Sequence, residues 1–259
     1  MLEQRGLSPR HRFGQNFLHD HNVLTKLVDA ADLSQGDVVL EIGPGTGILT
    51  EVLLEKGCRV VACELDRGLA DLVEERLGSS ITLIRGDCLK KRHLNLEIAD
   101  ALGNSPWKLV SNLPYQIASP LIVDLLANYP NCVGEYVTIQ LEVAQRLMAC
   151  VNSSSWGVLS ILTQRLADVS LITKVPPTCF WPPPKIISAC VSIDRKTTFP
   201  PAESEAFARF VTQLFTKRRK QLGSILGRDT KFPAGISASA RPSTLTIEQL
   251  ESLWRVCLS

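Results

Sequence analysis

The feature that most constrains the fold is a repeated alternation of short apolar runs with helical patterns between Val38 and Asp194. Short apolar runs are typical of buried strands, and longer amphipathic segments are typical of helices. Strands that alternate with helices in this way form parallel sheets with helices on both faces. The alternating segments are DVVLEIG, TGILTEVLLEKG, RVVACELD, RGLADLVEERL, ITLIRGD, WKLVSN, PLIVDLLANY and EYVTIQ. The sequence therefore predicts an α/β fold.

The segments on either side of this alternation extend the prediction. Downstream, the strand-like runs SLITKVP and ISACVSID are joined by a proline-rich stretch with no helical pattern. A parallel pair needs a long crossover, so these runs should form an antiparallel hairpin at one edge of the sheet. Upstream, HNVLTKLVDAADL predicts an amphipathic helix, preceded by a basic arm.

Past Lys196 the pattern changes to helices only, in ESEAFARFVTQLFTKRRKQLGSIL and TIEQLESLWRVCL. We predict a main domain over residues 1–195 and a small helical domain over residues 196–259. The second segment holds ten Lys or Arg against five Asp or Glu, although the whole chain carries a net charge of only +2. This surplus indicates either a surface that faces an anion or a solvated helix face.

Composition excludes several classes of protein. Hydrophobic residues make up 45% of the chain and charged residues 21%, as in folded, water-soluble proteins. No apolar run reaches the roughly 18 residues that cross a bilayer, and the first residues lack the apolar core of a signal peptide, so we expect a cytoplasmic protein with no membrane contact. The eight cysteines never form C-x-x-C and should be reduced core residues; the four histidines have no cysteine partners at zinc spacing, so we expect no metal.

A glycine-rich loop, Glu41 to Gly47, follows the first predicted strand. Glycines at such a turn let the backbone bend tightly and approach a ligand at the carboxyl edge of the sheet. The spacing is G-x-G-x-G, which differs from the G-x-G-x-x-G of dinucleotide sites and lacks the G-K-[ST] of a P-loop. Gly43 and Gly45 are therefore candidates to hold a different nucleoside ligand.

Acids follow the next two strands. Glu64 lies where a carboxylate can accept both hydroxyls of a ribose, and Asp87 can accept from the exocyclic amine of adenine. Each acid alone also fits a solvated loop or a helix cap. Together with the glycine loop, the two acids describe a site for S-adenosylmethionine.

The fourth strand ends in Asn112, Leu113, Pro114 and Tyr115. The side-chain carbonyl of Asn112 and the backbone carbonyl of Leu113 can both accept from an N6 amine, which draws its lone pair out of conjugation with the adenine ring. Pro114 fixes the turn, and Tyr115 offers an aromatic face for a base to stack on. Attack on a sulfonium methyl needs no general base, so positioning and electrostatics can carry the reaction.

Motifs along nearly the whole chain resemble one known family. They are FGQNFL at 13–18, EIGPGTGILT at 41–50, ELD at 64–66, GD at 86–87, NLPY at 112–115, QLEVAQR at 140–146, FWPPPKIISACV at 180–191 and F-x-x-R-R-K ending at Lys220. The chain resembles the ribosomal RNA adenine dimethyltransferases of the bacterial type, which modify two adjacent adenosines near the 3′ end of small-subunit (16S) ribosomal RNA. This resemblance implies a Rossmann-like class I methyltransferase fold and an S-adenosylmethionine-dependent enzyme of ribosome biogenesis.

The resemblance also implies roles for single residues. Asn16 and Leu18 would close over the cofactor, Gly43 would lie against its methionine part, and Asn112 would serve both cofactor and target. Glu64 would hold the ribose and Asp87 the adenine amine. Phe180 is similar to the family's second aromatic residue near the flipped base, although it also fits a core residue of the hairpin. Glu142 and Arg146 are more structural than catalytic.

Two basic segments are candidates for RNA contact through phosphate charge and guanidinium hydrogen bonds. They comprise Arg10, His11 and Arg12 on the arm and Lys217, Arg218, Arg219 and Lys220 on a predicted helix. The family usually continues R-R-K with a further basic residue and an asparagine, whereas Gln221–Ser224 follow here. The target adenosines must leave any stack to reach Tyr115, so single-stranded or loop RNA in an assembling 30S particle is the expected partner, with the enzyme as a monomer.

The sequence leaves three alternative functions, and each fits it less well than the small-subunit dimethyltransferase. A ribosome-assembly checkpoint factor would bind the small subunit with methylation secondary. The antibiotic-resistance branch that methylates large-subunit RNA more often shows N-I-P-Y where this chain has NLPY. A DNA adenine methyltransferase typically shows N-P-P-Y or D-P-P-Y and a sequence-reading domain, neither of which is present here.

Overall fold

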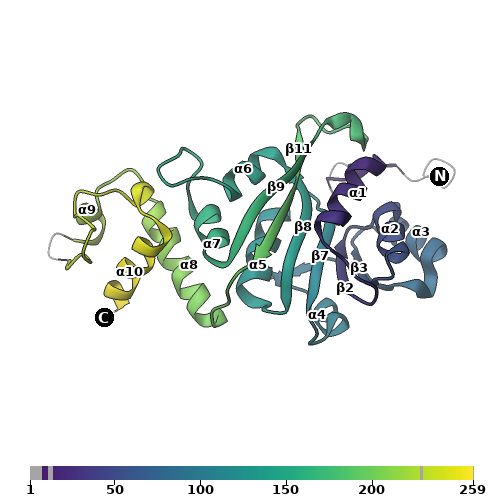
Figure 1. Cartoon of the computed structure of the whole chain (residues 1–259), viewed down its shortest axis with the longest axis horizontal. Helices are drawn as coiled ribbons and strands as arrows, with labels where there is room; N and C mark the ends of the chain where they lie inside the picture. Colours follow the sequence, from purple (N-terminus) through teal and green to yellow (C-terminus); the bar gives the residue numbers. More distant parts are fainter. Residues whose placement is uncertain (1–7, 11–13, 228–229, 259) are drawn as a thin grey trace.

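The computed structural model describes residues 8–10, 14–227 and 230–258, and a seven-stranded sheet forms its centre (Figure 1). The strand order is β4-β3-β2-β7-β8-β11-β9, in which the first five strands are parallel and β11 pairs antiparallel with both β8 and β9. The strands are β2 (Val38–Ile42), β3 (Arg59–Glu64), β4 (Thr82–Arg85), β7 (Trp107–Asn112), β8 (Cys132–Gln140), β9 (Ala167–Val175) and β11 (Ser188–Arg195). The predicted parallel sheet with an antiparallel edge hairpin is confirmed.

Helices cover both faces of the sheet, because successive residues of a strand point to opposite faces. In β2, Leu40 belongs to a hydrophobic cluster that includes residues of α4, α5, α6 and α7, whereas Val39 belongs to a second cluster with α1 and α2. Helix α3 packs beside β3 and β4. These helices are α1 (His21–Ala30), α2 (Ile48–Glu55), α3 (Arg67–Leu77), α4 (Leu96–Leu102), α5 (Ala118–Asn128), α6 (Leu141–Leu147) and α7 (Val158–Leu166).

Two short strand pairs and side-chain caps on α1 and α3 belong to the sheet domain. The strand β1 (Phe17–Leu18) pairs antiparallel with β10 (Phe180–Trp181), and β5 (Leu89–Lys90) pairs with β6 (His93–Leu94). The carboxylate of Asp20 caps α1, and that of Asp66 caps α3, by accepting backbone N–H bonds of the first turn. The caps fix where these two helices begin.

A third hydrophobic cluster joins the C-terminal helices to the segment around α7. These helices are α8 (Pro201–Phe215), α9 (Leu222–Leu226) and α10 (Ile247–Leu258). The cluster includes Phe207 and Trp254 from this part of the chain and Ala149, Trp156 and Ile161 from upstream. The domain boundary near residue 196 stays a prediction, and the core of the helical part reaches back across it.

The structure corrects the predicted continuous helix through the basic residues 217–220. Helix α8 ends at Phe215, and the N–H of Thr216 bonds to carbonyls of the last turn. The following residues form tight turns in which a backbone N–H bonds to the carbonyl three residues earlier, such as the Lys220 N–H to the Lys217 carbonyl at 2.8 Å. The turns bring Leu222 back into the third cluster, where it is fully buried. The basic residues therefore lie on a turn and not on a helix.

The cysteines match their predicted role with two exceptions. All eight are free thiols; six are buried, whereas Cys150 and Cys257 are exposed. Within the described ranges, no helix is both long and apolar enough to cross a membrane. Across the same ranges, no group of three or more His, Cys, Asp or Glu could hold a metal ion.

Candidate active site

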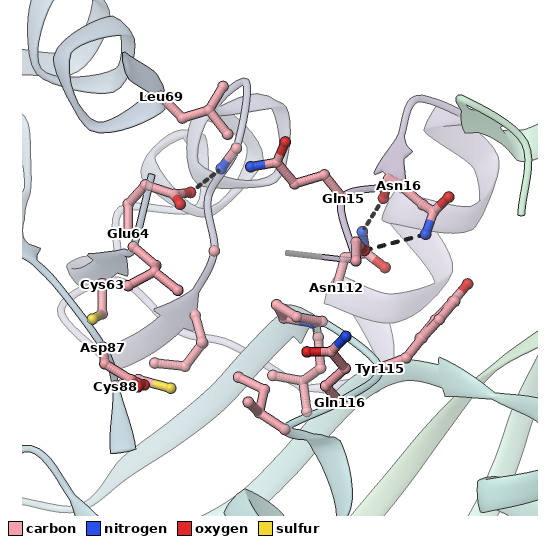
Figure 2. A pocket seen from close by; sticks show the side chains of 18 of the residues that line it. Gln15, Asn16, Cys63, Glu64, Leu69, Asp87, Cys88, Asn112, Tyr115 and Gln116 are labelled. Carbon is pink, nitrogen blue, oxygen red and sulfur yellow. Dashed lines mark hydrogen bonds between the residues drawn. The ribbon is translucent and has the colours of Figure 1, made fainter. Parts of the chain in front are cut away.

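A cavity of about 340 Å³ lies at the carboxyl edge of the parallel strands (Figure 2). Gly43, Glu64, Asp87 and Asn112, which end or follow β2, β3, β4 and β7, all line it. The N-terminal segment, residues 14–17, forms a further part of its wall. Open α/β sheets bind ligands at this edge, and the structure brings the strand-end residues predicted from the sequence together there.

The glycine loop adopts a backbone that other residues take up only with strain. Gly43, Gly45 and Gly47 have φ angles of 72°, 60° and 82°. A Cβ at Gly45 would lie 2.9 Å from the ring of Phe17, which contacts the loop from the N-terminal segment. The N–H of Gly45 also donates to the Oε2 of Glu64 at 3.2 Å. The glycines therefore allow this backbone conformation and the close approach of the Phe17 ring to the loop at the cavity wall.

The two acids differ in environment. Glu64 is buried and accepts N–H bonds from Gly45 and, at 2.8 Å, from Asp66. Burial raises the pKa of Glu64 above its ordinary value of 4.5. Asp87 is exposed on the same side of the cavity as Glu64, where it accepts a bond from the N–H of Leu89 at 3.0 Å (Figure 2). The pair offers one desolvated and one solvated hydrogen-bond acceptor for a nucleoside.

Two buried thiols, Cys63 and Cys88, line the cavity beside these acids. Burial raises the pKa of Cys63 to about 12 and also raises that of Cys88. Both thiols are therefore neutral and form an apolar wall suited to a flat ring. Their apolar sequence context predicts only core residues; their position next to Glu64 and Asp87 in the chain is the signal that could have identified them as site residues.

The carboxamide of Asn112 is fixed by the N-terminal segment. Its Nδ2 donates to the backbone carbonyl of Asn16 at 2.9 Å, and Figure 2 shows the two residues turned toward each other. The Nδ2 of Asn16 in turn donates to the carbonyl of Gly14 at 3.2 Å. With its nitrogen committed to Asn16, the side-chain oxygen of Asn112 is left to accept a hydrogen bond from a ligand in the cavity.

The side chain of Tyr115 is held by a residue of β11. Its hydroxyl lies 2.7 Å from the Oγ of Ser188, a fully buried residue at the start of β11. Burial raises the pKa of Tyr115, so the side chain is a neutral phenol. Pro114 packs over Gly43: a Cβ atom at Gly43 would lie only 3.6 Å from the Pro114 ring. No sequence pattern predicts the role of Ser188, since it lies 73 positions from Tyr115 in the chain.

Leu18 and Phe180 lie behind the cavity wall. They face each other across the β1–β10 pair, and both side chains are buried in the second hydrophobic cluster. Neither lines the cavity, whereas Phe17 does. Successive residues of a strand point to opposite sides, which puts Phe17 and Leu18 on different faces. The interpretation of Phe180 as a core residue of the hairpin fits this placement.

The N-terminal segment is anchored on the acid that caps α3. The guanidinium of Arg10 lies 3.1 Å from the Oδ2 of Asp66, and the backbone N–H of Arg10 donates to the Oε1 of Gln15 at 2.7 Å. The amide of Gln15 lies 3.4 Å from the same carboxylate oxygen. Arg10 is thus engaged with the protein itself, while His11 and Arg12 lie outside the described residues.

The basic turn at residues 217–220 is only partly available to RNA. Lys217, Arg219 and Lys220 are exposed. Arg218 is half-buried and donates to the backbone carbonyls of Ser154 at 3.0 Å and Ser153 at 3.2 Å. Arg218 therefore ties the turn to the segment before α7, and its three neighbours carry the exposed charge.

Glu41, near the end of β2, is buried next to Gly43 in the chain and does not line the cavity. It is fully buried and accepts a hydrogen bond from the hydroxyl of Thr50 at 2.6 Å. Burial raises its pKa to about 8. A protonated Glu41 adds no second negative charge beside Glu64, so the loop is supported without repelling that carboxylate.

Comparison with known proteins agrees with this geometry. Residues 6–249 match a family model described as ribosomal RNA adenine dimethylase. A protein of Magnetococcus marinus named ribosomal RNA small subunit methyltransferase A is 40% identical over 263 residues, which cover 98% of this chain and 93% of that protein.

Solved structures give the same fold. The crystal structure of a dimethyladenosine transferase from Plasmodium falciparum superposes with a TM-score of 0.74 and 24% identity, covering 92% of this chain and 95% of that one. The 23S rRNA methyltransferase ErmE superposes with a TM-score of 0.69 and 26% identity, covering 94% of this chain and 100% of that one. The sheet domain and the C-terminal helices are thus both represented among these structures.

Proposed function

This chain belongs to the ribosomal RNA adenine dimethylase family, and we propose that it dimethylates the N6 atoms of two adjacent adenosines near the 3′ end of small-subunit (16S) ribosomal RNA. It is an S-adenosylmethionine-dependent rRNA methyltransferase. The observation that carries the proposal is the carboxamide of Asn112, fixed by Asn16 with its oxygen free, beside Tyr115. The relative named for the small subunit is 40% identical, against 26% for the 23S enzyme, which favours the small subunit.

The residues around the cavity fit S-adenosylmethionine. Gly43 and Gly45, with their positive φ angles, would hold the backbone against the methionine part, and Glu64 would accept from the ribose hydroxyls. Asp87 would accept from the adenine amine, and the neutral thiols of Cys63 and Cys88 would lie beside the ring. When bound, the cofactor supplies an electrophilic methyl group on a positively charged sulfur.

The target adenine occupies the part of the cavity near β7. In the first transfer, the Oδ1 of Asn112 and the carbonyl of Leu113 accept the two N6 hydrogens, which localises the nitrogen lone pair for attack. In the second transfer a single N6 hydrogen remains, and one of these two carbonyls accepts it. The turn at Pro114 aims these acceptors, and the ring of Tyr115, anchored on Ser188, stacks on the base. The amine proton leaves to water afterwards, so these residues act through orientation and electrostatics.

RNA reaches this site as an unstacked strand within a pre-30S particle, with the enzyme acting as a cytoplasmic monomer. Lys217, Arg219 and Lys220 on the basic turn contact phosphates, as do the basic residues of the N-terminal arm. Arg10 contacts phosphate only when it leaves Asp66, because its guanidinium is paired there. Recognition of the particle depends on shape and backbone charge.

The test is transfer of radiolabelled methyl groups from S-adenosylmethionine to small ribosomal subunits that lack these modifications, followed by nucleoside analysis. We expect labelled dimethyladenosine in small-subunit RNA and none with an Asn112→Ala variant. Label found only in large-subunit RNA would show that the substrate is the large subunit and not the small one. Tight binding to the subunit without any transfer would favour an assembly checkpoint factor.

A further inference from the structure

An apolar surface lies on the connection between β10 and β11, at the end of the sheet next to α1 (Figure 1). Trp181, Ile186 and Ile187 are 42%, 43% and 48% exposed. Lys185, between them in the chain, is exposed as well. Large apolar side chains gathered on one short connection mark a binding surface more often than scattered ones do. We call residues 181–187 the rim loop.

The rim loop is tied to the candidate active site at both ends. At its start, the ring of Trp181 stacks on that of Phe17, with a centroid distance of 6.3 Å and an interplanar angle of 20°. Phe17 lines the cavity. At its end, the next residue is Ser188, whose hydroxyl meets that of Tyr115. Both ends of the rim loop therefore adjoin residues of the candidate active site.

The chemistry of the rim loop suits the bases of single-stranded RNA. A nucleotide that enters the cavity leaves its neighbours unstacked outside it, and every base has a face that an aromatic ring can cover. One face of Trp181 is taken by Phe17. The three consecutive prolines 182–184 restrict the backbone between Trp181 and Lys185, so little conformational entropy is lost on binding. Lys185 adds a cation for the adjoining phosphate.

We propose that Trp181 stacks on the base of the nucleotide adjacent to the target adenosine, with the aliphatic side chains of Ile186 and Ile187 beside it. This inference rests on the proposed function for the location of the target base. It makes Trp181 a determinant of RNA affinity and position and leaves cofactor binding to the residues within the cavity.

Tryptophan fluorescence measures the contact directly. The other three tryptophans, Trp107, Trp156 and Trp254, are only 3%, 1% and 6% exposed, so quenching by RNA reports on Trp181. We expect an oligoadenylate, titrated into the cofactor-loaded protein, to quench part of the emission. A Trp181→Phe variant should show no such quenching, because its remaining tryptophans are covered. Unchanged emission of the wild-type protein at saturating oligoadenylate would overturn the proposal.

Methyl transfer to undermethylated small subunits supplies the second measurement. Trp181→Ala should raise the KM for the subunits about tenfold or more, as expected for loss of one base–aromatic stack, while Trp181→Phe stays within about threefold. Leu96→Ala, at a 73% exposed apolar residue of α4, is the matched control and should change nothing. The Kd for S-adenosylmethionine should be unchanged in all three variants.

The outcomes separate the two proposals. If Trp181→Ala weakens cofactor binding and leaves the KM for subunits unchanged, Trp181 only supports Phe17 and the inference is wrong. An unchanged KM and an unchanged Kd would also refute it. If the wild-type protein labels no small subunit while oligoadenylate still quenches Trp181, the rim loop binds RNA and the proposed substrate is the part that fails.

Discussion

Replacing Arg165 with methionine tests how the C-terminal helices are attached to α7. The Arg165 side chain is only 3% exposed, and it contacts two carboxylates. Its Nη2 lies 3.0 Å from Glu203 of α8, and its Nε lies 2.6 Å from Glu251 of α10. Its guanidinium carbon also lies 3.7 Å from the centroid of the Phe199 ring. One side chain therefore links three helices and an aromatic residue.

The expected loss follows from this environment. Removing one member of a buried ion pair costs roughly 3–5 kcal/mol, because the partner charge is left without compensation. The Glu203 and Glu251 side chains are 35% and 21% exposed, so both regain part of their hydration. We therefore expect the lower end, about 3 kcal/mol of unfolding free energy. For a chain of this size, that loss corresponds to a fall in Tm of roughly 6–12 °C.

Urea denaturation followed by circular dichroism measures the change. Arg209→Met is the matched control, since Arg209 pairs with Glu205 on the exposed face of α8 with side chains 61% and 71% exposed; it should unfold like the wild-type protein. Glu251→Gln should cost less than Arg165→Met and cost nothing further in the Arg165→Met background. Wild-type stability in the Arg165→Met variant would refute the reasoning, because apolar packing would then replace the ion pairs in full.

Four further predictions follow from the site. Asn112→Ala should lower kcat for methyl transfer at least about a hundredfold, as for loss of an oriented polar group. Its Kd for the cofactor, measured by calorimetry, should stay within about fivefold of the wild-type value. If the variant keeps its rate of transfer, Asn112 is not the acceptor for the adenine amine. Ser188→Ala should lower kcat roughly fivefold through loss of one hydrogen bond to Tyr115, and an unchanged rate would show that Tyr115 needs no anchor. Arg219→Ala should lower the salt dependence of RNA binding by about one ion, whereas Arg218→Ala should lower stability because it removes two bonds to backbone carbonyls; equal effects of both on RNA binding alone would contradict this division. Burial raises the pKa of Glu41 from 4.5 to about 8, so the folded protein keeps a proton that the unfolded chain releases. The free energy of unfolding should therefore fall as the pH rises from about 4.5 to 8. Glu41→Gln should make this fall smaller in urea denaturation, and an equal dependence of the unfolding free energy on pH in both proteins would show that Glu41 ionises normally.

The strand-end residues could be predicted from the sequence because parallel strands buried on both faces appear as apolar runs, and the residue after each run meets the others at one edge. Helix α7 was missed for a related reason. Leu159 and Leu166 pack in the sheet cluster, Ile161 packs in the third cluster, and Arg165 is buried between. Helix α7 also buries the polar residues Ser160 and Thr163, so the buried positions of this helix do not coincide with its apolar residues.

The remaining differences come from contacts between residues far apart in the chain. The bond from Asn112 to Asn16 spans 96 positions, and the one between Tyr115 and Ser188 spans 73. The turn at the basic residues depends on Arg218 reaching carbonyls 64 and 65 positions away. Local periodicity carries no information on such pairs. The helix predicted from it therefore ran on through residues 217–220, which the tertiary contacts hold in a turn.

The bond between Asn16 and Asn112 also bears on the timing of catalysis. Two methyl groups on one adenosine require two cofactor molecules in succession, so the spent molecule must leave between the transfers. Asn16 lines the cavity through which this exchange takes place, and its carbonyl holds the Asn112 amide. A displacement of the N-terminal segment would therefore also leave the Asn112 amide free to rotate. The orientation of the acceptor oxygen at Asn112 thus depends on the same segment that forms part of the cavity wall.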